Sequence, residues 1–323
     1  MRRLALPSQA AYATADAALT SKGRSFHWAR RLLCVSHADR ATRLYGFCRR
    51  VDDLADDTVS PEVARDQLLA IERSLRDGHS ADPLVSDTLR LMQECAIDPA
   101  IPIALIRGVM TDLGQVRIAT EDDLLRYCYS VAGTVGLMMC AVLDVTDPRA
   151  VYHAIDLGIA MQLTNLCRDV RQDALAGRRY LPASLLGAVE PDRLLHPDSA
   201  DRPVIRETLA ALLRCADTYY HSGEAGLAYL PADARNGILV AVRIYRAIGH
   251  TVRARSFDYW TARAVVPTHR KAVITAGALI GWHLRRRAVQ PFAPHDCGLH
   301  QALAGYAGAN HGVLRQDGIR YAS

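Results

Sequence analysis

Two short segments of the sequence concentrate acidic side chains at helical spacing. In the first, Asp52 and Asp56 are four residues apart, and Asp53 and Asp57 repeat the pattern one residue later. On a helix each pair shares a face, and like charges at that spacing destabilise the helix by roughly 0.2–0.5 kcal/mol per pair. Taken alone, this segment is explained equally well by a solvated helix face or by a bound cation.

The second segment places Asn165, Asp169 and Asp173 at i, i+4 and i+8, again on one helical face. Apolar residues between them indicate a half-buried helix, where charges need partners. Both segments offer only oxygen ligands, which suit a hard ion such as Mg²⁺ held by one or two carboxylates together with substrate phosphates. Together they predict metal-assisted chemistry on a diphosphate, with Mg²⁺ or Mn²⁺ as the ion.

A basic pair precedes the first acidic segment. Arg49 and Arg50 lie about one turn before the carboxylates. From there their guanidinium groups can bind phosphate oxygens or pair with the acids along the helix.

A third segment, residues 127–136, combines tyrosines with Gly133 and Gly136 in a helical context. Each glycine costs a helix roughly 1 kcal/mol relative to Ala. Two interpretations remain open. The glycines allow two helices to pack closely, or small side chains leave a groove for a long apolar substrate with the tyrosines at its polar mouth.

The elements that must position these residues are helices. The chain has 323 residues, of which half are hydrophobic and 23% are charged, which is typical of a globular protein. Long segments lack Pro and Gly, and apolar residues recur at spacings of three and four. Ser60-Pro61 is typical of a helix start and Asp77-Gly78 of a helix end. We expect an all-α domain over residues 1–290 and an irregular C-terminal tail over 291–323.

Net charge and cysteine spacing indicate the kinds of binding partner and the cellular compartment to expect. The net charge of +5 suits anionic substrates or an anionic membrane surface and is no nucleic-acid signature. None of the eight cysteines forms a CxxC pair, so a reducing cytoplasm is expected. The apolar run 131–143 is too short for a membrane span of about 20 residues. We therefore expect a cytoplasmic protein that binds the inner membrane peripherally, with residues 280–287 as a candidate contact.

The chain resembles the squalene/phytoene synthase family, in particular its bacterial phytoene-forming members. The resemblance rests on residues 45–56, on YCYSVAGTVGLMM at 127–139, on QLTNLCRDVRQD at 162–173 with 178–182 after it, and on Ser25-Phe26. A weaker match extends from Ile244-Tyr245 to Val266-Pro267. Together these segments span roughly residues 15–285.

The resemblance implies a class I terpenoid-synthase bundle with a central cavity. It implies catalytic roles for Asp52, Asp56, Asp169 and Asp173, and metal ligation by Asp52, Asp56, Asn165 and Asp169. It implies substrate contacts for Arg24, Ser25, Tyr45, Arg49, Tyr129, Gln162, Arg168 and Tyr245. Residues 22–25 depart from the family pattern, because Gly23 and Arg24 stand where Ser and Lys are common.

The implied reaction is the head-to-head condensation of two geranylgeranyl diphosphates to phytoene, through a cyclopropyl (prephytoene) diphosphate, in carotenoid biosynthesis. It releases two diphosphates and needs no NADPH. Downstream carotenoid enzymes are candidate partners, and no nucleic acid is expected. One alternative is a squalene- or dehydrosqualene-type synthase acting on farnesyl diphosphate, and another is a noncatalytic helical scaffold.

Overall fold

The computed structural model describes residues 9–21, 23–57, 60–285 and 294–310. Within these ranges the fold is all-α, as predicted, and the one β-type pairing is an isolated bridge between Arg117 and Arg179. The helical elements, in chain order, are α1 (Gln9–Ser21), α2 (Arg24–Arg30), α3 (Val35–Asp57), α4 (Pro61–Asp77), α5 (Pro83–Cys95), α6 (Ala100–Met110), η1 (Thr111–Leu113), α7 (Glu121–Cys128), η2 (Tyr129–Gly133), α8 (Thr134–Val142), α9 (Ala150–Leu175), α10 (Ala183–Leu186), α11 (Pro191–Leu195), α12 (Asp201–Ala225), η3 (Gly226–Tyr229), α13 (Ala232–Ala254), α14 (Thr268–Arg285) and η4 (Cys297–Leu303).

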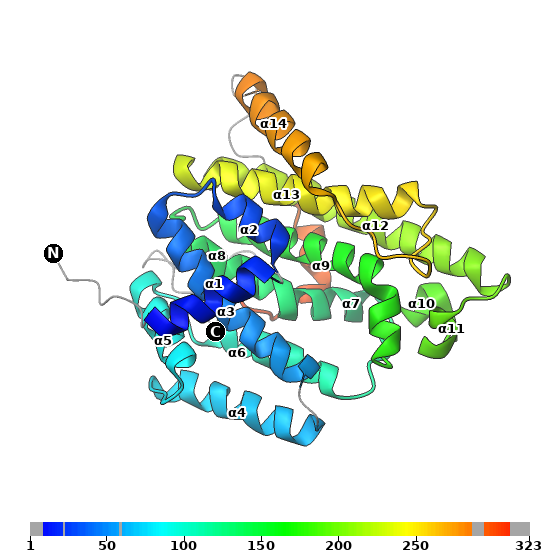
Figure 1. Ribbon diagram of the computed structural model, residues 1–323, viewed down its shortest axis with the longest axis horizontal. Helices are drawn as coiled ribbons and strands as arrows, with labels where there is room; N and C mark the ends of the chain where they lie inside the picture. The colour runs from blue at the N-terminus through cyan, green and yellow to red at the C-terminus, as the bar shows by residue number, and fades with distance from the viewer. Residues whose placement is uncertain (1–8, 22, 58–59, 286–293, 311–323) are drawn as a thin grey trace.

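Helix α9 is the centre of the bundle. It packs against α8, α12, α13 and η2, and Figure 1 shows it running through the middle of the molecule. Ile155, Ile159 and Leu163 repeat at four-residue spacing along it and are completely buried. The second acidic segment therefore sits on a helix whose position is fixed by packing on several sides.

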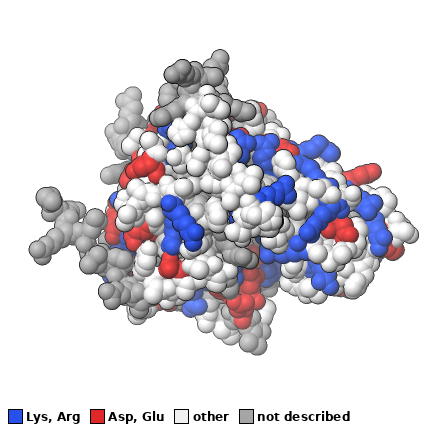
Figure 2. All heavy atoms as spheres, turned by 45° about the horizontal axis from the view of Figure 1, so that its top comes forward, with Lys and Arg blue, Asp and Glu red and all other residues white. Residues whose placement is uncertain are grey.

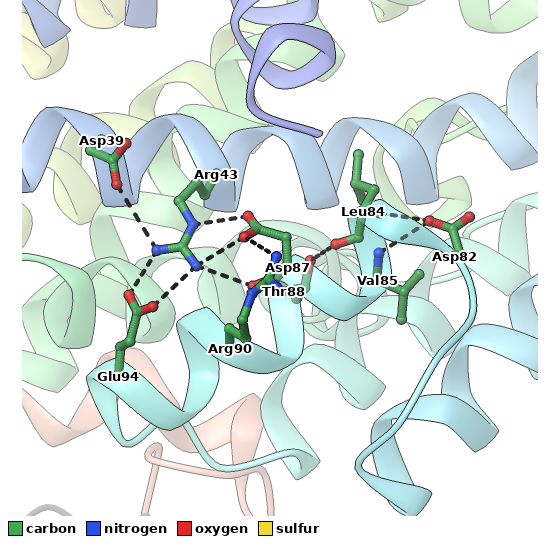
Figure 3. A network of polar contacts seen from close by, with 9 residues as sticks. All are labelled: Asp39, Arg43, Asp82, Leu84, Val85, Asp87, Thr88, Arg90 and Glu94. Carbon is green, nitrogen blue, oxygen red and sulfur yellow. Dashed lines mark hydrogen bonds and ion pairs between the residues drawn. The ribbon is translucent and has the colours of Figure 1, made fainter. Parts of the chain in front are cut away.

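Helix α3 carries the first acidic segment and is held by a buried arginine. Arg43 is 5% exposed, and it donates through Nε to Asp87 Oδ2 at 2.9 Å and through Nη1 to Glu94 Oε2 at 2.7 Å. Both partners lie on α5, and Figure 3 shows the guanidinium between them, with Asp39 of α3 beside it. This network fixes α3 against α5.

The predicted start and end of α4 are confirmed. Ser60 precedes Pro61, and its hydroxyl accepts from the backbone N–H of Val63 at 3.5 Å. Gly78 closes the helix with φ of 73°, a left-handed conformation that favours glycine.

The glycine-containing third segment forms a π-helical turn, η2, followed by α8. A Cβ added at Gly136 would lie 2.1 Å from the carbonyl oxygen of Ala154 on α9, and one added at Gly158 would lie 2.3 Å from that of Ala132. These glycines therefore permit close packing of η2 and α8 on α9. Ala132 and Gly136 also line a cavity described below, so the two interpretations are compatible.

One helical stretch in the described residues, Glu121–Val142, is long and apolar enough to cross a membrane by length and composition. It exceeds the run 131–143 considered in the sequence. Leu137 and Met138 of this stretch are at most 1% exposed. Its η2 and α8 parts pack on α9, and Val135 and Met139 line the cavity. In all, 44% of its apolar window is buried in the fold.

The expectation of an irregular tail needs correction for residues 294–310. This segment contains η4 and docks on the bundle. Leu303 is completely buried, and three carbonyl oxygens of the segment accept hydrogen bonds from the bundle. The donors are Arg126 Nε to Ala302 O, Tyr129 Oη to Ala307 O and Tyr219 Oη to Leu299 O. The mixture of Gly, His and Pro gave no periodicity from which these long-range contacts could be predicted.

Candidate active site

The two acidic segments face each other across the bundle. Burial raises the pKa of Asp52 to about 7, with Arg49 opposing the shift and Asp56 adding to it. Burial, followed by the charge of Asp169, raises the pKa of Asp173 to about 8, and Asp56 contributes from α3. Carboxyl groups on α3 and α9 are therefore close enough for the charge of one to shift the pKa of another. The prediction of a cation bound by both segments requires this proximity.

A further acid, Asp112 of η1, belongs to this cluster. It accepts hydrogen bonds from Tyr180 Oη at 2.7 Å and Tyr127 Oη at 3.0 Å. Burial raises its pKa to about 6 against those bonds, and its charge acts on Asp52 and Asp173. The sequence does not single it out, because a lone aspartate in a short 3₁₀ turn has no helical spacing to mark it.

Arginines neutralise part of the cluster. Arg178 donates to Asp56 at 2.8 Å. Asp169 accepts from Arg168 at 2.8 and 2.5 Å and from Arg263 at 2.6 and 2.9 Å. Burial pushes the pKa of Asp169 upward, but these hydrogen bonds outweigh it and hold the pKa below its usual range. Neither Arg178 nor Arg263 was predicted as a site residue, although 178–182 belongs to the family resemblance.

An apolar cavity of about 280 Å³ begins beside the acids. Its polar end includes Asp52, Asn165 and Gln162, and its walls are largely aliphatic. It extends past α8 and α9 to Ala150 at the start of α9. Fifteen residues separate Ala150 from Asn165, which at the helical rise corresponds to about 22 Å. The arrangement suits a molecule with a charged head and a long hydrocarbon tail.

Aromatic rings stand near the polar end. Tyr45 of α3 and Tyr245 of α13 line the cavity, and the ring of Phe26 lies 6.2 Å and 5.2 Å from theirs. Ring faces attract cations, so this end of the cavity can stabilise positive charge on a bound hydrocarbon while excluding water.

The residues fit a hard divalent ion. Asn165 Oδ1 is buried and accepts no hydrogen bond within the described part of the chain. Burial and neighbouring carboxylates raise the pKa values of Asp52 and Asp173, so a cation bound between them would favour their ionised forms. All these donors are oxygens, which Mg²⁺ prefers. Ligation by Asp52, Asp56, Asn165 and Asp169 stays a prediction, and Asp56 and Asp169 first have to leave their arginines.

The predicted substrate-binding residues fall into distinct groups. Tyr45, Gln162 and Tyr245 line the cavity. Two arginines lie at its acidic end, where Arg49 pairs with Asp53 and Arg168 with Asp169. Ser25 is partly buried on α2, and its substrate contact stays a prediction. Lys22 and the side chain of Arg24 lie outside the described residues.

The prediction for Tyr129 needs correction. Its side chain is 1% exposed, and its hydroxyl donates to the carbonyl oxygen of Ala307 at 2.6 Å. The ring packs edge-on against Tyr306 with centroids 4.9 Å apart. The π turn directs Tyr129 toward the C-terminal segment, where it serves as an anchor.

Comparison with known proteins agrees with this geometry. The family model for squalene/phytoene synthase matches residues 19–271. The chain is 35% identical over 293 residues to the phytoene synthase of Cereibacter sphaeroides, covering 86% of this chain and 80% of that protein. It is 33% identical over 284 residues to the 15-cis-phytoene synthase of Pantoea ananas, covering 84% of this chain and 91% of that protein.

Solved structures agree as well. A dehydrosqualene synthase in complex with a ligand superimposes with a TM-score of 0.74 at 26% identity, covering 85% of this chain and 98% of that one. The helical bundle of this chain is thus the fold of the isoprenoid synthases. The chain belongs to the squalene/phytoene synthase family.

Proposed function

We propose that this enzyme condenses two geranylgeranyl diphosphates head to head to phytoene, by way of a cyclopropyl diphosphate. The observation that carries the proposal is the continuity of the facing acids with a long apolar cavity. One end is built for diphosphate and the other for hydrocarbon. The relatives named phytoene synthase support the twenty-carbon substrate.

The acidic segments and the nearby arginines would stabilise the diphosphate leaving group. A divalent ion bound between the two acidic segments would neutralise the departing diphosphate and the charge that develops on it. Arg49, Arg168 and Arg178 stand at the same end and can donate to diphosphate oxygens once they exchange their carboxylate partners. Their guanidinium groups hold the leaving group in place.

The cavity walls control the carbocation. When the C–O bond of the first substrate breaks, the electron pair leaves with the diphosphate, and the double bond of the second substrate captures the allylic cation. Closure of the cyclopropane releases a proton, which the departed diphosphate can accept. Loss of the second diphosphate and of a second proton then completes phytoene. Tyr45, Tyr245 and Phe26 surround this end of the cavity and can stabilise the positive charge. The aliphatic walls beyond them exclude water, which would otherwise quench the cation.

The test is product analysis with purified protein. Incubation with geranylgeranyl diphosphate should give phytoene and two diphosphates without NADPH, and chelation by EDTA should stop the reaction until Mg²⁺ is restored. Farnesyl diphosphate with and without NADPH forms the comparison arm. If the enzyme forms product from farnesyl diphosphate and none from geranylgeranyl diphosphate, it belongs to the squalene or dehydrosqualene branch instead.

We further propose that the enzyme works at the inner membrane surface of the cytoplasm and there delivers its apolar product to downstream carotenoid enzymes. Support comes from α14, which projects from the bundle in Figure 1. Val273, Ile280 and Leu284 are 71%, 59% and 77% exposed, and their spacing places them on one face. The surface around α14 in Figure 2 is mostly uncharged.

Liposome flotation tests the membrane proposal. Replacing Val273, Ile280 and Leu284 by Ser should abolish flotation with anionic vesicles while leaving turnover in detergent unchanged. Residues 286–287 of the predicted contact 280–287 lie outside the described residues, so the charge contribution is tested separately with Arg285–Arg287 replaced by Ser. Equal flotation of all three proteins would remove α14 from consideration.

A further inference from the structure

The C-terminal segment brings two histidines onto a buried aspartate of α9. His295 Nε2 lies 2.6 Å from Asp156 Oδ2, and His300 Nε2 lies 2.9 Å from Asp156 Oδ1. The three side chains are 0–3% exposed. Thirteen residues of α9 separate Asp156 from Asp169, about 20 Å along the helix. Both histidines follow residue 271, where the family match ends, so this cluster is distinct from the acidic site.

The hydrogen bonds around the cluster fix which atoms carry protons. His300 Nδ1 lies 3.3 Å from the carbonyl oxygen of Ala309, which can only accept, so Nδ1 must donate. In a neutral ring, Nε2 then carries a lone pair, and it points at a carboxylate oxygen. Two acceptors at 2.9 Å repel each other unless one of them carries a proton or both bind a common cation.

Hydrogen bonds orient Asp156 and His300 in the way that is common for metal ligands. Ser222 Oγ donates to Asp156 Oδ2 at 2.5 Å and lies 3.0 Å from His153 Nδ1. Ligating histidines commonly donate their other ring nitrogen to a backbone carbonyl, and ligating carboxylates are commonly hydrogen-bonded in turn. Ala309 and Ser222 supply both kinds of support here.

We propose that Asp156, His295 and His300 form a binding site for one divalent transition-metal ion of the zinc class, which clasps the C-terminal segment to α9. Two imidazole nitrogens and a carboxylate oxygen are ligands that Zn²⁺ takes at about 2.0–2.2 Å. Mixed nitrogen and oxygen donors separate this site from the oxygen-only acids, which suit Mg²⁺. The ion would take the place of the proton that the close contact between His300 Nε2 and Asp156 Oδ1 otherwise requires.

The experiment uses the full, untagged chain with zinc alone as the probe. Protein stripped with a chelator is dialysed against Zn²⁺ in excess Mg²⁺, and bound zinc and the thermal midpoint are measured. We expect one zinc per chain and a raised midpoint. His295→Gln and His300→Gln should weaken zinc binding at least about tenfold, and Ser222→Ala by about 10–100-fold.

A second group within the described residues, Cys34, His37 and Asp233, could also hold an ion, so Cys34→Ser is the matched control and should leave zinc binding unchanged. X-ray absorption on the zinc-loaded Cys34→Ser protein should count two imidazole ligands, a readout that needs no histidine variant to fold. No tight zinc, or zinc without imidazole ligands, would overturn the proposal and leave a proton as the bridging charge.

Discussion

Arg263 holds Asp169 with both arms of its guanidinium group, at 2.6 Å and 2.9 Å, although 94 residues separate them. Asp169 also accepts from its neighbour Arg168. A carboxylate expected to bind a metal is thus neutralised by two arginines. Binding of the proposed ion and diphosphate would break these pairs, and the released arginine would then be free to donate to the diphosphate.

Replacing Arg263 by Ala should therefore change diphosphate binding and Mg²⁺ binding in opposite directions. Loss of a charge-assisted hydrogen bond to diphosphate costs about 1.5–3 kcal/mol, so KM for the prenyl diphosphate should rise about tenfold or more. The Mg²⁺ concentration for half-maximal rate should fall, because Asp169 is freer. Arg149→Ala, which removes an exposed pair with Asp147, serves as control. A rise in the Mg²⁺ requirement would mean that Arg263 only positions Asp169.

The aspartates themselves are tested by charge removal. Asp52→Asn and Asp169→Asn should each lower kcat by at least about 10²-fold, the low end for a lost electrostatic group, with helicity unchanged by circular dichroism. Asp66→Asn, an exposed position on α4, should have no effect. Near-normal turnover in both variants would contradict metal ligation by the two segments.

The sequence predicted the helical fold and both acidic segments, because periodicity and like-charge spacing are local properties. It did not predict Asp112, Arg178 or Arg263, whose importance arises from contacts between distant segments. It misplaced Tyr129 because a π turn changes the direction of side chains that regular helical spacing would share. The docking of residues 294–310 was missed because its hydrogen bonds join it to side chains far away in the sequence, among them Asp156 and Tyr219, and no local pattern marks such pairs.

Metal-free protein should become less stable as the pH rises from about 4 to about 8. The pKa values of Asp52 and Asp173 are raised from 3.8 to about 7 and about 8 in the folded protein. Across that window the folded state binds protons that the unfolded chain has released, so the free energy of unfolding falls with pH. Thermal midpoints in EDTA should show this decline, and Asp173→Asn should flatten it. Mg²⁺ should oppose it, because ligation requires the ionised carboxylates. A midpoint that climbs with pH in EDTA would contradict the placement of these acids.

Arg43 should matter for stability more than any exposed arginine. Its guanidinium is buried between Asp87 and Glu94 (Figure 3), and removing one partner of a buried ion pair costs about 3–5 kcal/mol. Arg43→Met should lower the free energy of unfolding by that amount in urea titrations. Arg76→Ala, whose side chain is 52% exposed, should change it by less than about 1 kcal/mol. Comparable effects of the two would mean that α3 is held by apolar packing alone.

The length of tail that the cavity accepts should respond to Ala132 and not to Gly136. Both residues line the cavity, but the missing Cβ of Gly136 faces the backbone of Ala154 at 2.1 Å. Gly136→Val therefore forces α8 away from α9, and overpacking costs about 1–3 kcal/mol or more. We expect a lowered thermal midpoint and equal losses of kcat/KM for geranylgeranyl and farnesyl diphosphate.

Ala132→Phe instead adds volume where the hydrocarbon would lie. A steric block discriminates by more than the roughly 1–3 kcal/mol of a single methylene, so the ratio of kcat/KM should move toward farnesyl diphosphate by about tenfold or more. The midpoint should change less than in Gly136→Val. Measuring both specificity constants and the midpoint on each variant separates cavity shape from helix packing. If Ala132→Phe lowers the midpoint and leaves the ratio of the two specificity constants unchanged, Ala132 does not determine the length of hydrocarbon tail that the cavity accepts.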